Sequence, residues 1–144
     1  MSAEYFIDTN LFIYQIDATD NAKAAVANRI IRSGIKTGNA CISFQVVQEC
    51  LNTILRKAAI CLSTDQAMQY LDASLAPLLQ VYPSIPLYRH CLEVQARYRF
   101  SFYDSLIIAA ALEAGCNTLY SEDLQHGQKI AGLRVENPFL DDNN

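Results

Sequence analysis

The chain has 144 residues and a formal net charge of −4, with 51% hydrophobic and 18% charged residues. This length and composition predict one domain with a normal apolar core, and they exclude a disordered, collagen-like or disulfide-stabilised chain. The longest unbroken apolar run, 106–112, is too short to cross a bilayer, and the first residues do not resemble a signal peptide. We therefore expect a cytoplasmic protein.

The predicted secondary structure alternates short strands with helices. In the first part of the chain we expect a strand at 4–7, a helix beginning around 9–14, a helix at 20–33 that ends before Gly34, and a loop at 34–39. The middle part is expected to form a strand at 40–42, helices at 44–59 and 63–76, and a strand at 78–82. In the last part we expect helices at 86–99 and 103–114, a strand at 117–120, a short helical turn at 121–128 and a strand at 133–136. This alternation predicts an α/β domain with a mainly parallel sheet. The domain is expected to occupy 1–140, with 141–144 as a short polar tail.

The cysteines are odd in number, widely spaced and never in a Cys-x-x-Cys pair. They are Cys41, Cys50, Cys61, Cys91 and Cys116. The two histidines do not lie near two cysteines in the sequence, so a zinc site is not expected. We expect five reduced thiols that are buried as small apolar side chains.

Four acidic residues lie where a ligand site is expected in such a fold. Asp8 directly follows the first strand, and Asp123 follows the strand at 117–120. Glu49 lies in the second turn of the helix after the second strand, and Asp104 opens the apolar helix at 103–114. Ligands of open α/β sheets bind beyond the carboxyl ends of the strands. We expect these four carboxylates to converge there.

Each acid also has a structural interpretation. Asp8, Asp104 and Asp123 stand near helix N-termini, where acids cap the helix or interact favourably with its dipole. Glu49 falls on the polar face of its helix together with Gln45, which is typical of a face exposed to solvent.

Taken together, the four acids favour a metal site. Carboxylates at close range disfavour one another's ionisation unless a cation neutralises them. Carboxylate oxygens suit Mg²⁺ or Mn²⁺, and such ions lower the pKa of a bound water and stabilise displacement at phosphorus.

The net negative charge is compatible with a nucleic-acid substrate. When the four acids are set aside, eleven acidic residues remain against eleven basic ones. The basic residues occur in local groups, which are Arg29, Arg32 and Lys36; Arg56 and Lys57; and Arg89, Arg97 and Arg99. These groups are explained either as solvated helix faces or as contacts to phosphates.

Four segments together resemble the motifs of PIN-domain ribonucleases. They are FIDTNLFIY at 6–14, FYDSLIIAAA at 102–111, LYSEDL at 119–124 and LRVENPF at 133–139. The likeness is greatest to the VapC-type toxins of bacterial toxin–antitoxin pairs, and it spans nearly the whole chain in the family's order.

The resemblance implies a three-layer PIN-like fold with a parallel five-stranded sheet flanked by helices. It implies that Asp8, Glu49, Asp104 and Asp123 are the catalytic, metal-binding acids. By the same resemblance, Thr9 and Ser121 are polar residues that support them. Four further residues are expected near the site, namely Asn10, Tyr103, Ser105 and Glu122.

The implied activity is Mg²⁺- or Mn²⁺-dependent endonucleolytic cleavage of RNA, in a homodimer that a cognate antitoxin inhibits. One alternative is a PIN-like scaffold that binds RNA or protein without cutting. Another is an Asp-nucleophile phosphotransferase, but that class needs a second Asp where Asn10 stands, and a lysine that none of the motifs contains.

Overall fold

The computed structural model describes residues 3–57 and 59–140, so the predicted tail at 141–144 lies outside the described residues. The predicted α/β architecture is confirmed. The strands are β1 (Tyr5–Ile7), β2 (Ala40–Ser43), β3 (Leu79–Val81), β4 (Thr118–Tyr120), β5 (Lys129–Ile130) and β6 (Leu133–Glu136). The α-helices are α1 (Thr9–Ile16), α2 (Asn21–Thr37), α3 (Phe44–Arg56), α4 (Thr64–Tyr70), α5 (Ile85–Tyr98) and α6 (Phe102–Glu113).

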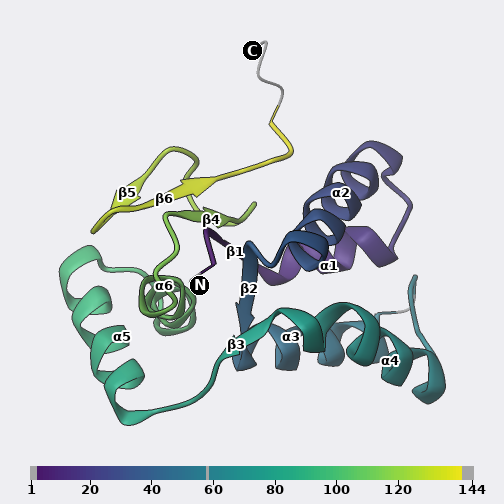
Figure 1. Ribbon diagram of the computed structural model, residues 1–144, viewed down its shortest axis with the longest axis horizontal. Coiled ribbons are helices and arrows are strands. Elements are labelled where there is room, and N and C mark those ends of the chain that lie inside the picture. Colours follow the sequence, from purple (N-terminus) through teal and green to yellow (C-terminus); the bar gives the residue numbers. More distant parts are fainter. Residues whose placement is uncertain (1–2, 58, 141–144) are drawn as a thin grey trace.

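The sheet has the strand order β3-β2-β1-β4-β6-β5. The first five strands in this order run parallel, and β5 pairs antiparallel with β6 at the edge. The sheet therefore has the five parallel strands expected and one additional two-residue strand. Figure 1 shows α5 and α6 on one side of the sheet and α1 to α4 on the other.

Strand β1 lies at the centre of the sheet and is buried because layers of helices cover both of its faces. Phe6 and Ile7 have no exposed surface. Phe6 is in register with Cys41 of β2 and Leu119 of β4, so these three strands end close together. The amide of Asp8 donates to the carbonyl of Tyr120 at 2.9 Å and continues this alignment past β1.

Helix α6 is buried between helix α5 and the sheet. Residues 105–111 are all buried, as its continuous apolar sequence predicts. None of the helices within 3–57 and 59–140 combines the length and the apolar character needed to span a membrane.

The prediction that the second helix ends before Gly34 is wrong. Helix α2 continues through Gly34 to Thr37, and Gly38 ends it with a φ of 76°. Gly34 is required for close packing, because a Cβ atom there would lie 2.4 Å from the Cβ of Ala40 in β2. The glycine that terminates the helix is thus four residues later than the one predicted.

Three other local predictions need correction. Residues 121–128 form bends and a turn rather than a helical turn, and they lead into β5, which was not predicted. The helix predicted at 63–76 is α4 followed by a π-helical turn, Leu71–Leu75, and a 3₁₀ turn, Ala76–Leu78. Cys61 is exposed, while the other four cysteines are buried and all five are free thiols.

Candidate active site

Asp8 is a buried carboxylate at the carboxyl end of β1. It is 8% exposed, and its side chain caps α1 by accepting a hydrogen bond from the amide of Thr9 at 2.7 Å. Ser121, just beyond β4, donates its hydroxyl to the other carboxylate oxygen at 2.8 Å. Burial raises the pKa of Asp8 to about 6, although both hydrogen bonds act in the opposite direction.

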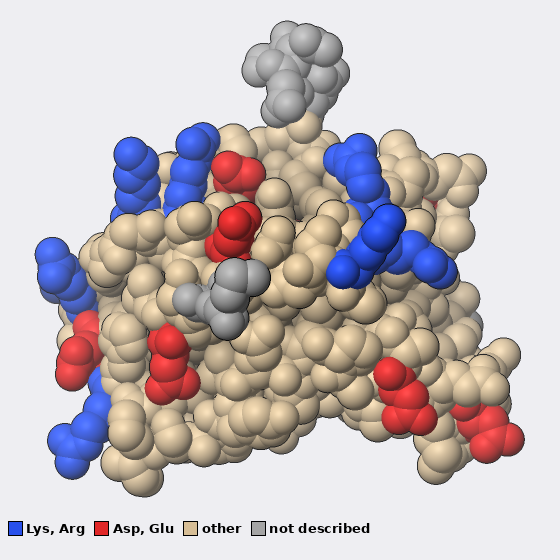
Figure 2. Space-filling view, in the orientation of Figure 1, with Lys and Arg blue, Asp and Glu red and all other residues tan. Residues whose placement is uncertain are grey.

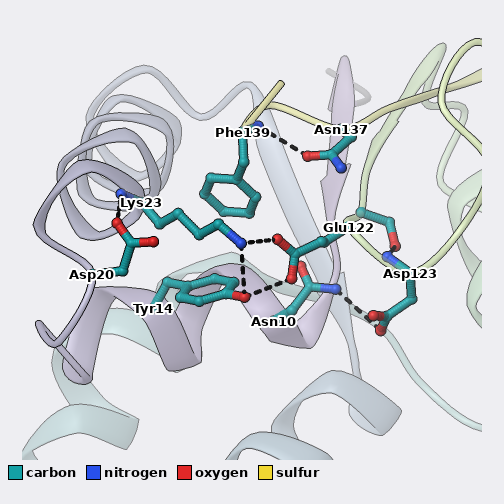
Figure 3. Close-up of polar contacts among 9 residues, drawn as sticks. Asn10, Tyr14, Asp20, Lys23, Glu122, Asp123, Asn137 and Phe139 are labelled. Atoms are coloured by element: carbon teal, nitrogen blue, oxygen red, sulfur yellow. Dashed lines mark hydrogen bonds and ion pairs between the residues drawn. The ribbon is translucent and has the colours of Figure 1, made fainter. Parts of the chain in front are cut away.

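Glu49 and Asp123 lie near enough to Asp8 for their charges to raise its pKa further. Thr9 donates its hydroxyl to Glu49 at 3.4 Å, and Ser121 accepts from the amide of Asp123 at 3.2 Å. Asn10 in α1 donates its amide to the carboxylate of Asp123 at 3.2 Å (Figure 3). The structure thus brings three of the four predicted acids, and both polar residues expected beside them, to one edge of the sheet.

Gln45 connects Glu49 to the start of α6. Its amide nitrogen donates to the carboxylate of Glu49 at 2.7 Å and to the carbonyl of Tyr103 at 3.1 Å. Gln45 is only 3% exposed, so the expectation that it lies on a solvent-facing surface with Glu49 is wrong. The start of α6, 58 residues away in the sequence, covers it.

Asp104 occupies the first turn of α6, next to Tyr103. Its amide donates to the hydroxyl of Ser101, which caps the helix, and its side chain is partly buried. Within the described chain, no hydrogen bond or ion pair of the Asp104 carboxylate is recorded, and its charge is not among those that shift the pKa of Asp8. The bridge through Gln45 places this turn beside Glu49.

A cavity of about 500 Å³ adjoins Glu49. Its lining residues are Gln45, Gln48, Glu49, Asn52 and Tyr103. Glu49 is itself a lining residue, so the cavity extends from this acid along α3. Gln45 could not be recognised as part of the site from its own helix, because Tyr103 is a distant residue.

Glu122 belongs to a second polar cluster, defined by Tyr14, Lys23 and Glu122, and the structure records no bond from it to the other acids among the residues described. Lys23 and Tyr14 both contact its carboxylate at 2.6 Å, and the Lys23 ammonium lies over the rings of Tyr14 and Phe139 (Figure 3). Burial alone would raise the pKa of Glu122, but these hydrogen bonds lower it overall. This cluster joins α1, α2 and the segment after β4.

The donor set fits a hard divalent cation in its chemistry. Asp8, Glu49 and Asp123 supply carboxylate oxygens, and the pKa of Asp8 is raised first by its burial and then by the charges of the other two acids. Over residues 3–57 and 59–140, no three His, Cys, Asp or Glu side chains are already close enough together to hold a metal ion. Four buried side-chain atoms near these elements lack a hydrogen-bond partner in the described chain, namely Asn10 Oδ1, Ser43 Oγ, Gln45 Oε1 and Ser105 Oγ.

The basic side chains are dispersed on the face drawn in Figure 2. Lys and Arg residues gather over α2 at the upper right and near β5 and β6 at the upper left, with acidic residues between and below them. Among the described side chains of this face they form no single continuous band.

The α/β fold agrees with comparisons to known proteins. The model of the PIN domain family matches residues 5–130. The chain belongs to the PIN domain family.

Solved structures share this fold at low sequence identity. VapC20 of Mycobacterium tuberculosis, described as a sarcin–ricin loop cleaving toxin, is 21% identical, with a TM-score of 0.63 over 83% of this chain and 90% of that one. DNA-bound VapBC of Salmonella typhimurium is 18% identical, with a TM-score of 0.66 over 93% and 97% of the two chains. PAE2754 of Pyrobaculum aerophilum is 22% identical, with a TM-score of 0.59 over 94% and 92%. No protein of curated function matches the sequence.

Proposed function

We propose that this protein is a Mg²⁺- or Mn²⁺-dependent endoribonuclease and the toxin of a toxin–antitoxin pair. The observation that carries the proposal is the burial of Asp8 beside Glu49 and Asp123, which raises the pKa of Asp8 to about 6. Keeping a buried carboxylate ionised beside two other acids costs free energy unless a cation compensates their charges. Membership of the PIN domain family supports a nuclease in particular.

In this proposal Asp8, Glu49, Asp104 and Asp123 hold the metal. When bound, the ion supplies Lewis-acid polarisation of a phosphate and a lowered pKa of a coordinated water. Asp104 is included because the motif at 102–111 resembles that of the family and because Gln45 holds the start of α6 beside Glu49.

The neighbouring polar residues orient the acids. Thr9 and Ser121 hold Asp8 through both carboxylate oxygens, and Ser121 also holds the backbone of Asp123. Asn10 fixes the Asp123 carboxylate, and Gln45 fixes that of Glu49. Asp8, Glu49 and Asp123 are thereby held in place before RNA binds, which reduces the reorganisation needed during the reaction. The proposal also requires basic side chains to position the RNA backbone through its phosphates.

The proposed partners are a cognate antitoxin and a second copy of the chain. Several similar structures are described as VapBC or toxin–antitoxin complexes, among them those from Salmonella typhimurium and Klebsiella pneumoniae. These likenesses support an antitoxin partner. An antitoxin that covers the acidic site, a homodimer and a cytoplasmic location are further parts of the same proposal.

The test is cleavage of total bacterial RNA with added Mg²⁺ or Mn²⁺ and with EDTA. We expect products only with metal, and we expect Asp8→Asn and Asp104→Asn to reduce the rate by at least about a hundredfold. Asp65→Asn is the matched control, because Asp65 is an exposed acid in the first turn of α4.

RNA binding is measured separately from cleavage to distinguish the non-catalytic scaffold. A scaffold would bind RNA without forming product at any metal concentration. Full activity of a folded Asp8→Asn variant would show that the acidic site is not the catalytic site.

A further inference from the structure

Helix α3 presents a row of carboxamides beside the acidic site. Gln45, Gln48, Glu49 and Asn52 are spaced so that they share one face of the helix, and all four line the cavity of about 500 Å³. Glu49 is the acid in this row, and its carboxylate accepts from the hydroxyl of Thr9, the residue after Asp8. The cavity is therefore continuous with the proposed catalytic residues.

Gln45 gives this cavity an unusual inner wall. It is 97% buried, and both of its recorded hydrogen bonds use the amide nitrogen, which leaves Oε1 without a partner among the described residues. An unpaired buried acceptor costs free energy, and Gln45 is retained at this wall despite that cost. Gln48 and Asn52, farther along the row, are exposed and offer both donors and acceptors.

Tyr103, at the start of α6, also lines the cavity. Its side chain is 66% exposed and lies edge-to-face against Phe102, which is 42% exposed, with ring centroids 5.3 Å apart. Large exposed aromatic side chains are costly in water, and aromatic rings are the surfaces on which unpaired nucleobases stack. The main chain that carries this ring is fixed, because the carbonyl of Tyr103 accepts a hydrogen bond from the amide of Gln45.

We propose that this cavity is a nucleobase-binding subsite for single-stranded RNA, in which one base next to the scissile phosphate stacks on Tyr103 while Gln48 and Asn52 contact its polar edge. The subsite rests on the proposed nuclease function and extends it to substrate selection. Carboxamides are suited to the donor and acceptor edges of bases, and a phosphate would be repelled by Glu49 at the same position.

The experiment measures binding of fluorescein-labelled eight-nucleotide RNAs in Mg²⁺ to protein carrying Asp8→Asn, which is expected to bind without cutting. We expect Tyr103→Ala to weaken binding about tenfold and Tyr103→Phe to change it less than about twofold, because stacking needs the ring and not the hydroxyl. Gln48→Ala and Asn52→Ala are expected to reduce the preference among RNAs of different base composition. Tyr82→Ala is the matched control, since Tyr82 is exposed to a similar extent outside the cavity.

A second arm uses RNAs that carry one abasic position. The RNA whose missing base is the stacked one should bind Tyr103→Ala and the parent equally well. Equal binding of Tyr103→Ala and the parent to every intact RNA, with circular dichroism showing both folded, would overturn the subsite. If metal-dependent cleavage persisted in that case, the proposed function would stand. If the unmodified protein neither bound nor cleaved RNA, both proposals would fail.

Discussion

At the scale of single residues, Asp8 determines the electrostatics of the site. Its carboxylate is buried at the carboxyl end of the central strand β1, where it accepts hydrogen bonds from Thr9 and Ser121. These bonds do not offset the cost of burial, since the pKa is raised from 3.8 to about 6. A side chain retained in its charged form at such a position is expected to serve a ligand rather than stability.

The raised pKa predicts how stability varies with pH in the metal-free protein. Between about pH 4 and 6 the folded state binds more protons than the unfolded state, so the free energy of unfolding falls as the pH rises through this window. A shift of about 2 pKa units corresponds to about 3 kcal/mol at neutral pH. We therefore expect Asp8→Asn to stabilise the metal-free protein by about 2–3 kcal/mol at pH 7 and to have little effect at pH 4.

Urea unfolding in EDTA at the two pH values measures this difference. Asp123→Asn is the control, because Asp123 is exposed at the same site and is expected to change stability by less than about 1 kcal/mol. An Asp8→Asn variant that is less stable than the parent at pH 7 would contradict the assigned cost of burial.

The sequence predicted those site residues whose position follows from a strand end. Asp8 comes directly after β1, Asp123 lies three residues after the end of β4, and parallel neighbouring strands bring their ends together. Gln45 could not be predicted, because it is buried by the start of α6 rather than by its own helix. Glu122 was expected near the site, but its bonds are to Lys23 and Tyr14, which the local sequence does not reveal.

At the scale of secondary-structure elements, close packing of α2 on β2 depends on Gly34. A glycine within a helix usually lowers stability relative to alanine by about 1 kcal/mol. Here a Cβ atom would lie 2.4 Å from that of Ala40, which belongs to a buried strand and cannot move without disturbing the sheet. The sequence alone does not distinguish such a packing glycine from a terminating one.

Gly34→Ala is therefore expected to destabilise the protein by about 1–3 kcal/mol, despite the higher helix propensity of alanine. Ala25→Gly, at an exposed position of the same helix, measures the difference in helix propensity between alanine and glycine without a packing effect. It is expected to lower the free energy of unfolding by about 1 kcal/mol. Denaturant unfolding gives both values. A Gly34→Ala variant more stable than the parent would mean that the close approach to Ala40 is not maintained in solution.

The cluster of Tyr14, Lys23 and Glu122 joins three elements. Tyr14 comes from α1, Lys23 from α2 and Glu122 from the segment that follows β4. Because Glu122 is only partly exposed, we expect Tyr14→Phe to cost about 1 kcal/mol of unfolding free energy. In a double-mutant cycle, Glu122→Gln should reduce that cost, since the two side chains share one hydrogen bond. Fully additive effects would contradict direct coupling.

At the scale of the whole molecule, the sheet order explains why sequence-distant acids meet. The central strand β1 lies between β2 and β4, so the segments after these strands all open at one edge. The parallel order could be predicted from the alternation of strands and helices. Edge strand β5 was missed because its two residues, Lys129 and Ile130, carry too little pattern.

The proximity of the acids predicts that a divalent cation stabilises the folded protein. A ligand that binds only the folded state at a hundred times its dissociation constant adds about 2.7 kcal/mol to the free energy of unfolding. We expect Mn²⁺ to raise the melting temperature of the parent. The increase should be smaller in variants that lack one of the four acids, and chelation by EDTA should reverse it.

The most direct test of the account is titration calorimetry of the metal-free protein with Mn²⁺, repeated for Asp8→Asn, Glu49→Gln, Asp104→Asn and Asp123→Asn, with Asp65→Asn as the control. The account predicts saturable binding to the parent and the control, and binding weakened by at least about tenfold in each of the four variants. Absence of saturable Mn²⁺ binding to the parent, or equal binding by all four variants, would contradict a metal site formed by these acids.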